Sequence, residues 1–280
     1  SLSVVSIGTE SETARISFFD PSPVAIKLGR KHLYDTHATS GTGVVACASC
    51  HVDARMDRLA WDLGDPSGAM KVVDNSQNLG ASVPGLDTGF EDWHPMKGPM
   101  LTQTLQDIIG KEPHHWRGDR DGLEEFSGAF LGLLGDDETL TVAEMQEFED
   151  FLATIFFPPN PFRNFDNTLP TDVPLPGHYT TGRFGPAGQP LPTGNAVAGL
   201  ALFRPPTLLD GGALACVSCH TRSTGAGTDR RLQGLTYQPF RVGPKGEHHL
   251  ALVSVDGLTN ITMKVPQLRS LYERTGLNTT

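Results

Sequence analysis

All four cysteines of this 280-residue chain lie in two pentapeptides of the form Cys-x-x-Cys-His. They are Cys47-Ala48-Ser49-Cys50-His51 and Cys216-Val217-Ser218-Cys219-His220. Three kinds of chemistry use closely spaced cysteines of this kind: a redox dithiol, a zinc site and the covalent attachment of haem. The spacing between the motifs and the histidine in each of them decide among the three.

Haem attachment explains both motifs best. The two knuckles of a zinc ribbon lie about 15 to 20 residues apart, whereas here the first motif ends at residue 51 and the second begins at residue 216. A thioredoxin-like dithiol is expected once and needs no histidine after its second cysteine. Haem c needs two thiols on one helical turn and an adjacent histidine that reaches the iron. The sequence therefore predicts two haem c groups, with His51 and His220 as proximal iron ligands.

Composition and charge narrow the partners and the location. The formal net charge is −10, and because phosphate binding needs a basic face, we expect no nucleic-acid partner. No apolar run is long enough for a membrane span. The first residues lack the pattern of a signal peptide, which we interpret as a processed chain. Because haem c is assembled on exported chains, we expect a bacterial periplasmic, extracellular or cell-surface protein.

Helices are the elements expected to position the two motifs. One helix should start near Pro23, with Ser22 as its cap, and end before Thr36. The clearest pattern is 141–156, which opens with a Thr-x-x-Glu capping box and carries an apolar stripe. Shorter helices are predicted at 101–109, 123–134 and 195–203, and the segment around Val4 to Ile7 is strand-like.

The chain is expected to divide into two related halves. Gly29 and Gly199 open similar segments before the two motifs, and Lys97-Gly98-Pro99 and Lys264-Val265-Pro266 follow them, which indicates a duplication. The predicted parts are an N-terminal arm or end of a preceding domain (1–20), a first cytochrome c domain (21–157), a proline-rich linker (158–192) and a second cytochrome c domain that looks truncated (193–280). The expected fold is mainly α, with two cytochrome c-like helical domains in tandem, one covalently bound haem c in each, and few strands.

Two haem motifs in this order, together with segments 97–99, 116–120 and 264–269, make the chain resemble the bacterial di-haem cytochrome c peroxidase superfamily. That superfamily includes the methylamine-utilisation di-haem enzyme, and the resemblance spans roughly residues 20–280. The chain is still more similar to the cytochrome domain found after β-propellers in some large bacterial proteins. The resemblance implies that peroxide reacts at the N-terminal haem and that the C-terminal haem collects electrons from a donor protein.

The resemblance also implies roles for single residues. Trp116 would bridge the two haems, with an ordinary core tryptophan as the alternative, and His94 would be a distal residue of the first haem. Arg269 would pair with a haem propionate, with a surface salt bridge as the alternative. A calcium ion between the domains is a further cofactor that the family allows, although Asp136 to Glu138 are more simply explained as charges near a helix N-terminus. The family's distal glutamate motif is not recognisable, which lowers the expectation of peroxidase activity.

The sixth iron ligands decide between electron transfer and catalysis. An iron held on both faces passes electrons, whereas an open face can bind peroxide or oxygen. For the first haem the candidates are His94 and Met100, followed by Met96, His114 and His115. For the second haem they are Met263, followed by His248 and His249, or a ligand from another chain.

We therefore expect a di-haem c-type cytochrome that transfers electrons between its haems and redox partner proteins. One alternative is a peroxidase or oxidase that activates hydrogen peroxide or oxygen at the N-terminal haem. Another is an electron-carrier subunit of a homo-oligomer, a larger complex or a polymer. An open sixth site would favour the enzyme, and a ligand supplied in trans would favour the assembly.

Overall fold

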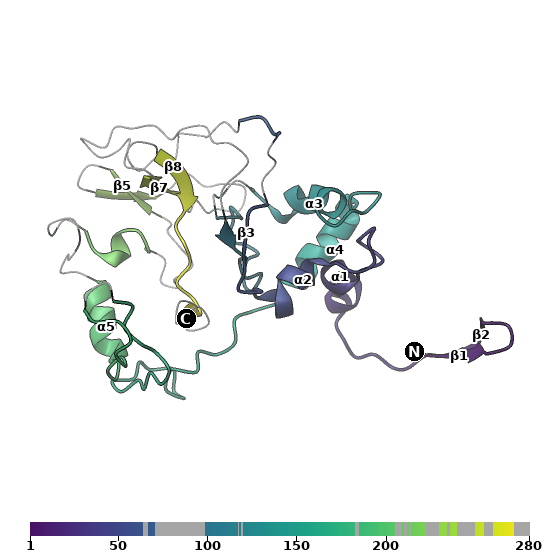
Figure 1. Cartoon of the computed structure of the whole chain (residues 1–280), viewed down its shortest axis with the longest axis horizontal. Coiled ribbons are helices and arrows are strands. Elements are labelled where there is room, and N and C mark those ends of the chain that lie inside the picture. Colours follow the sequence, from purple (N-terminus) through teal and green to yellow (C-terminus); the bar gives the residue numbers. More distant parts are fainter. Residues whose placement is uncertain are drawn as a thin grey trace.

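Four of the five described α-helices lie before residue 153, whereas short antiparallel strand pairs occur both early and late in the described chain (Figure 1). The computed structural model describes residues 1–63, 67–70, 99–116, 118, 120–182, 185–204, 209, 212, 214–221, 230–233, 236–239, 250–254 and 260–271, with backbone alone over 230–263. The α-helices are α1 (Val24–Tyr34), α2 (Cys47–Cys50), α3 (Ser127–Gly132), α4 (Val142–Leu152) and α5 (Ala196–Phe203). Short 3-10 helices cover Val52–Ala54, Leu123–Phe126 and Cys216–Ser218. The strands pair as β1 (Leu2–Ser6) with β2 (Ser11–Ile16), β3 (Ala60–Trp61) with β4 (Met100–Leu101), β5 (Arg230–Gln233) with β6 (Thr236–Pro239), and β7 (Leu250–Ser254) with β8 (Asn260–Lys264).

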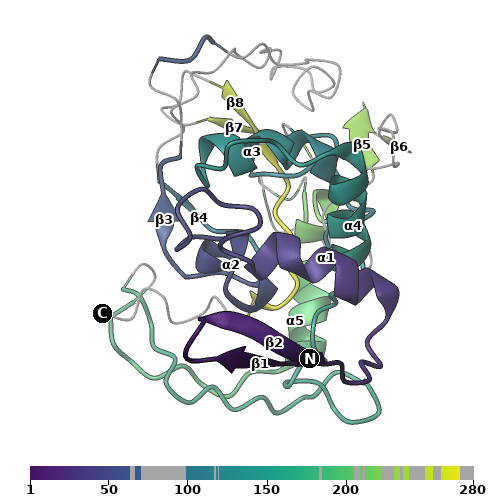
Figure 2. The same cartoon turned by 90° about the vertical axis from the view of Figure 1, so that its right-hand side faces the viewer.

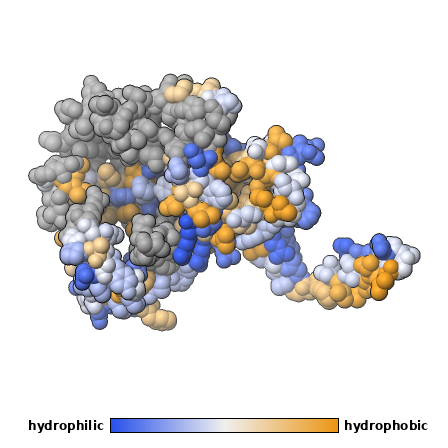
Figure 3. Space-filling model, in the orientation of Figure 1, coloured by the Kyte–Doolittle hydropathy of each residue, from blue (hydrophilic) through white to orange (hydrophobic). Residues whose placement is uncertain are grey.

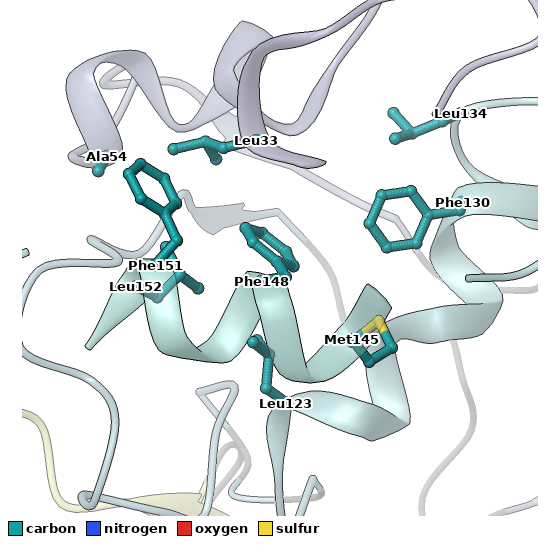
Figure 4. Close-up of a cluster of buried hydrophobic side chains, with 9 residues drawn as sticks. All are labelled: Leu33, Ala54, Leu123, Phe130, Leu134, Met145, Phe148, Phe151 and Leu152. Atoms are coloured by element: carbon teal, nitrogen blue, oxygen red, sulfur yellow. The ribbon is translucent and has the colours of Figure 1, made fainter. Parts of the chain in front are cut away.

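The core of the first half forms where α1 packs on α4 (Figures 2 and 4). In Figure 4, Phe148 and Phe151 of α4 lie beside Leu33 of α1, and Phe130 of α3 lies on the other side of Phe148. The two helices approach closely at Gly29, because a Cβ atom placed there would lie 2.1 Å from the Glu147 carbonyl oxygen. Glycine at this position therefore allows the contact that closes the core.

Two of the described α-helices have a side-chain cap at the N-terminus. At the start of α4, Thr141 Oγ1 accepts from the Glu144 N–H (3.3 Å) and Glu144 Oε2 accepts from the Thr141 N–H (3.0 Å), which confirms the capping box. Asn195 caps α5 through its side-chain oxygen. The expectation for α1 is wrong in its cap, since Pro23, which has no side-chain acceptor, occupies the N-cap position rather than Ser22.

The helix predicted at 101–109 is absent from the structure. Leu101 ends β4, and the chain continues as an irregular segment. Two of its N–H groups donate hydrogen bonds to carbonyls that are distant in sequence. The Leu105 N–H donates to the Ala54 carbonyl (2.8 Å), and the Asp107 N–H donates to the Ile155 carbonyl (2.8 Å). These tertiary hydrogen bonds replace those that a helix would have made. The predicted helix at 123–134 forms as a 3-10 turn followed by α3.

The predicted fold class, mainly α with two cytochrome c-like helical domains in tandem, is wrong. Among the described residues of the second half, α5 is the one α-helix, and two β-hairpins follow the second motif. Unlike α1, α5 buries none of its residues, and Leu202 is 62% exposed. The repeated motifs predicted duplication of a helical haem domain, but the described chain after the second motif forms antiparallel strands instead. The predicted domain boundaries stay predictions.

The N-terminal strands form a hairpin that projects from the body of the molecule (Figures 1 and 3). Strand character around Val4 is thereby confirmed, and Figure 3 shows apolar surface along the hairpin and its stalk. The described residues of 158–192 form no helix, and Phe162, Val173 and Leu191 from this region help to line a pocket of about 320 Å³. No described helix has the length and apolar character needed to cross a membrane.

Candidate functional site

The first Cys-x-x-Cys-His motif is folded as a single helical turn on the edge of the core. Its two cysteines begin and end α2, and Cys47 packs against the buried cluster. Ser49 stabilises the turn, because its hydroxyl oxygen accepts from the Ala46 N–H (3.0 Å) while the Ser49 N–H donates to the Ala46 carbonyl (2.9 Å). This serine supplies the reverse half of a capping box, since Ala46 has no side-chain acceptor.

His51 follows the turn with its ring orientation fixed. Nδ1 donates to the Gln103 carbonyl oxygen at 2.8 Å, which leaves the ligand lone pair on Nε2 in the neutral ring. Burial lowers the pKa of His51. Hydrogen bonds with the backbone of Gln103 and Arg55 act in the opposite direction and raise this pKa, but burial is the larger effect. A neutral imidazole whose second nitrogen is held by a carbonyl is the arrangement that metal-ligating histidines use.

The thiols of the first motif are protonated at neutral pH. Burial raises the pKa of Cys47 to about 11. Burial and the neighbouring Asp57 carboxylate also raise the pKa of Cys50. That carboxylate is itself anchored, because Asp57 Oδ2 accepts from Trp61 Nε1 (2.7 Å) and Asp57 Oδ1 accepts from the Leu59 N–H (2.9 Å).

The second motif repeats the serine hydrogen bonds of the first, although its turn is a 3-10 turn and not an α-helical one. The Ser218 hydroxyl accepts from the Ala215 N–H (3.0 Å), and the Ser218 N–H donates to the Ala215 carbonyl (2.9 Å). His220 lies near Phe203 at the end of α5, with 6.2 Å between ring centroids. Burial lowers the pKa of His220. Its Nδ1 atom is buried and lacks a hydrogen-bond partner among the described residues, in contrast to His51.

These residues fit covalent haem attachment. Both motifs present two cysteine thiols on one turn with a histidine directly after it. Burial lowers the pKa of both His51 and His220 and so favours the neutral ring, which is the form that can bind iron. Within the described ranges, no group of three or more His, Cys, Asp or Glu side chains could hold a metal ion, and the calcium expectation stays a prediction.

Trp116 lies where the two halves of the chain meet. Its indole Nε1 donates to the Leu101 carbonyl (2.7 Å), and its own carbonyl accepts from the Lys264 N–H (2.7 Å). Arg269 forms an ion pair with Asp107 and covers the Phe157 ring, with 4.3 Å between the guanidinium carbon and the ring centroid. The predicted contact of Arg269 with a haem propionate stays a prediction.

Some of the candidate sixth ligands lie among the described residues and others do not. Met100 lies in β4, where it pairs with Trp61. Met263 pairs with Ala251 in the β7–β8 ladder, and its side chain lies outside the described part. His94, Met96, His248 and His249 also lie outside it. His114 is buried and His115 packs edge-on against Phe126, with 4.7 Å between ring centroids. The assignment of the sixth ligands stays a prediction.

Three contributors to the site were missed at the level of sequence. Gln103 acts through its backbone carbonyl, which no side-chain pattern announces. Asp107 gains its role from a fold that brings Arg269 to it. Ser49 could have been found, because Ser218 stands at the same place in the second motif.

Comparisons with known proteins add little to this geometry. No protein-family model and no curated protein matches the chain. One solved structure is similar. It is hydrazine synthase of Kuenenia stuttgartiensis, pressurised with xenon, with 16% identity, a TM-score of 0.47 and coverage of 92% of this chain and 75% of that chain. Similarity at this level carries no argument about function, which rests on the residues themselves.

Proposed function

We propose that this chain is a c-type cytochrome that binds one haem c at each Cys-x-x-Cys-His motif and transfers electrons. The observation that carries the proposal is the shared local fold: a serine-capped turn presents two thiols and a following histidine at both sites. When bound, haem c supplies a one-electron iron couple.

The protein groups would hold and orient the proximal side of each site. Cys47 and Cys50 would form the two thioethers of the first site, and Cys216 and Cys219 those of the second. The hydrogen bond from His51 to the Gln103 carbonyl would keep Nε2 directed at the iron and raise its basicity. His220 has no such described partner, so we infer that the two histidines donate unequally to their irons.

Trp116 is proposed to lie on the path between the two sites. Its indole N–H donates a hydrogen bond to the carbonyl of Leu101, two residues before Gln103. Its own carbonyl accepts a hydrogen bond from the N–H of Lys264 in the second half. This arrangement supports the bridging role that the resemblance implies. Because thioethers form on exported chains, we also propose a periplasmic or cell-surface location, with redox proteins as partners.

The direct test is haem stoichiometry. The chain would be exported in a bacterium that matures c-type cytochromes, and haem would be counted by pyridine haemochrome and intact mass. We expect two haems in the parent and one after Cys47→Ala/Cys50→Ala or after Cys216→Ala/Cys219→Ala. Ser49→Ala and Ser218→Ala remove the caps but keep the thiols, so they separate the two contributions: we expect two haems in both variants, because the thioethers form on the cysteines. A parent chain without covalent haem, beside a mature control cytochrome, would refute the proposal.

The same samples report whether either iron has an open face. Electron transfer predicts that both haems are low-spin in the electron paramagnetic resonance spectrum, in the oxidised and the half-reduced protein, because protein ligands close both faces. A high-spin haem in either state would instead support activation of peroxide or oxygen at that iron.

A further inference from the structure

The segment 264–269 is held on the first half of the chain at its two ends. We call these two contacts, of Lys264 and of Arg269, the clamp. At one end, Lys264 donates its N–H to the Trp116 carbonyl (2.7 Å) and its ammonium group to the Pro113 carbonyl (3.0 Å). At the other end, Arg269 binds Asp107 and Phe157. Val265, next to the first anchor, is 2% exposed. The two ends lie five positions apart, so the segment is held at both ends.

Asp107 is the residue of the first half that pairs with Arg269 in this clamp. One carboxylate oxygen accepts from Lys111 Nζ (2.9 Å), and the other pairs with Arg269. The Asp107 side chain is 12% exposed and that of Arg269 is 30% exposed, so the pair is shielded from solvent more than most surface ion pairs. Removing one partner would leave the other charge incompletely compensated in a partly buried place.

Asp107 is the last residue of the segment 103–107, whose first residue, Gln103, contacts His51 of the first site. Within residues 103–107, the Gln103 carbonyl accepts from His51 Nδ1, and the Leu105 N–H donates to Ala54, three residues beyond that histidine. The Asp107 N–H then donates to the Ile155 carbonyl (2.8 Å). The 103–107 segment is therefore held between the proximal histidine at one end and the clamp at the other.

We propose that Arg269 is a positioning residue for the first haem site: through Asp107 it holds the 103–107 segment, and with it the Gln103 carbonyl that orients His51. This inference rests on the proposed function, in which His51 is an iron ligand. Loss of the clamp would weaken the hydrogen bond to the carbonyl and make His51 a poorer donor. A poorer donor stabilises the oxidised iron less, so the first haem becomes easier to reduce.

The test uses the full-length holoprotein and the variants Arg269→Met and Asp107→Asn. Asparagine tolerates the left-handed backbone of Asp107 (φ 56°) and keeps its N–H, so it removes the charge alone. In both variants we expect amides of 103–107 to exchange with deuterium about tenfold faster, because the local opening costs less. At a fixed potential, the reduced-to-oxidised ratio of the first haem should rise at least about threefold. The first-haem signal is the one that survives Cys216→Ala/Cys219→Ala.

Arg15→Met is the matched control, because it breaks the exposed ion pair with Glu12 in the N-terminal hairpin by the same substitution. It should change neither readout. The double variant Arg269→Met/Asp107→Asn should shift the first haem no further than either single variant, since both act on one contact. Lys111→Met removes the second partner of the Asp107 carboxylate, and it should change amide exchange and first-haem reduction less than Arg269→Met does.

Several outcomes would overturn the inference. One is exchange at 103–107 and first-haem reduction that match the Arg15→Met control. Another is faster exchange that extends equally to the α4 amides, since it would mean general destabilisation rather than local positioning. Haem counting on the same samples keeps the two proposals apart: two haems without these shifts refute the positioning role alone. A chain without haem at the first motif refutes the proposed function, while exchange still reports on the clamp.

Discussion

At the scale of single residues, the two sites share their turn and differ in the support of their histidines. His51 has a backbone carbonyl on Nδ1, whereas Nδ1 of His220 is buried with no partner among the described residues. Each serine cap uses a hydroxyl that the sequence repeats at the same place in both motifs. The chemistry of attachment is thus local, and its tuning depends on residues far along the chain.

The thiols also differ, which yields a test on the haem-free protein. Burial raises the pKa of Cys47 to about 11, whereas Cys219 is exposed. At pH 8 only about one Cys47 in a thousand would be a thiolate. We expect iodoacetamide to modify Cys47 much more slowly than Cys219, and its rate to climb with pH toward 11, as followed by peptide mass spectrometry. In urea the difference should vanish; equal rates in the folded chain at pH 8 would contradict the burial of Cys47.

At the scale of elements, the contact between α1 and α4 supports the first site. Cys47 and Ala48 pack against the same cluster as Leu33 and Phe151. His32, also on α1, is buried, and its Nε2 atom lies 3.2 Å from the Glu147 carboxylate of α4. The close approach of these helices at Gly29 therefore positions the turn that carries the thiols.

Substitution of Gly29 should expose this dependence. In Gly29→Ala the new Cβ would meet the Glu147 carbonyl at 2.1 Å and Phe151 Cβ at 2.4 Å, so the helices must separate. We expect a loss of about 2 to 3 kcal/mol in the free energy of unfolding, measured by urea denaturation, despite the better helix propensity of alanine. Gly128→Ala in α3 is the control, because its Cβ meets nothing within 4 Å. A neutral Gly29→Ala would mean that the helices are less closely packed than described.

At the scale of the whole molecule, the parts are joined to very different degrees. The C-terminal segment 264–269 is bonded to the first half through Trp116, Pro113 and Asp107. The β1–β2 hairpin projects away from the body, and its residues are exposed except for Ser6, which is half-buried (Figure 3). Stability of the body should therefore depend on the first connection and not on the second.

Removal of residues 1–19 tests this division. The contact of Lys27 with the Asp20 carbonyl (2.6 Å) would remain. We expect the free energy of unfolding to change by no more than about 0.5 kcal/mol, since the removed side chains bury little surface. Thermal and urea unfolding of the truncated and complete chains would measure the difference. A larger loss would show that the hairpin packs on the body in solution.

The sequence by itself determined the candidate chemistry and the strongest local elements. Two pentapeptides were enough to identify thiols and histidines, because their spacing on one helical turn is a local property. The capping box at Thr141 and the apolar stripe of α4 likewise depend on neighbours within a few residues, and the structure confirms them.

Tertiary structure alone decided what surrounds these residues. The predicted helix at 101–109 gave way to an irregular segment because Ala54 and Ile155 accept its amide hydrogen bonds. The mainly α expectation failed in the second half, where the described chain after the second motif pairs as hairpins. The Gln103 carbonyl and the Arg269–Asp107 pair join positions that are far apart in sequence. Such contacts form between whatever surfaces the fold brings together, so no local pattern could have indicated them.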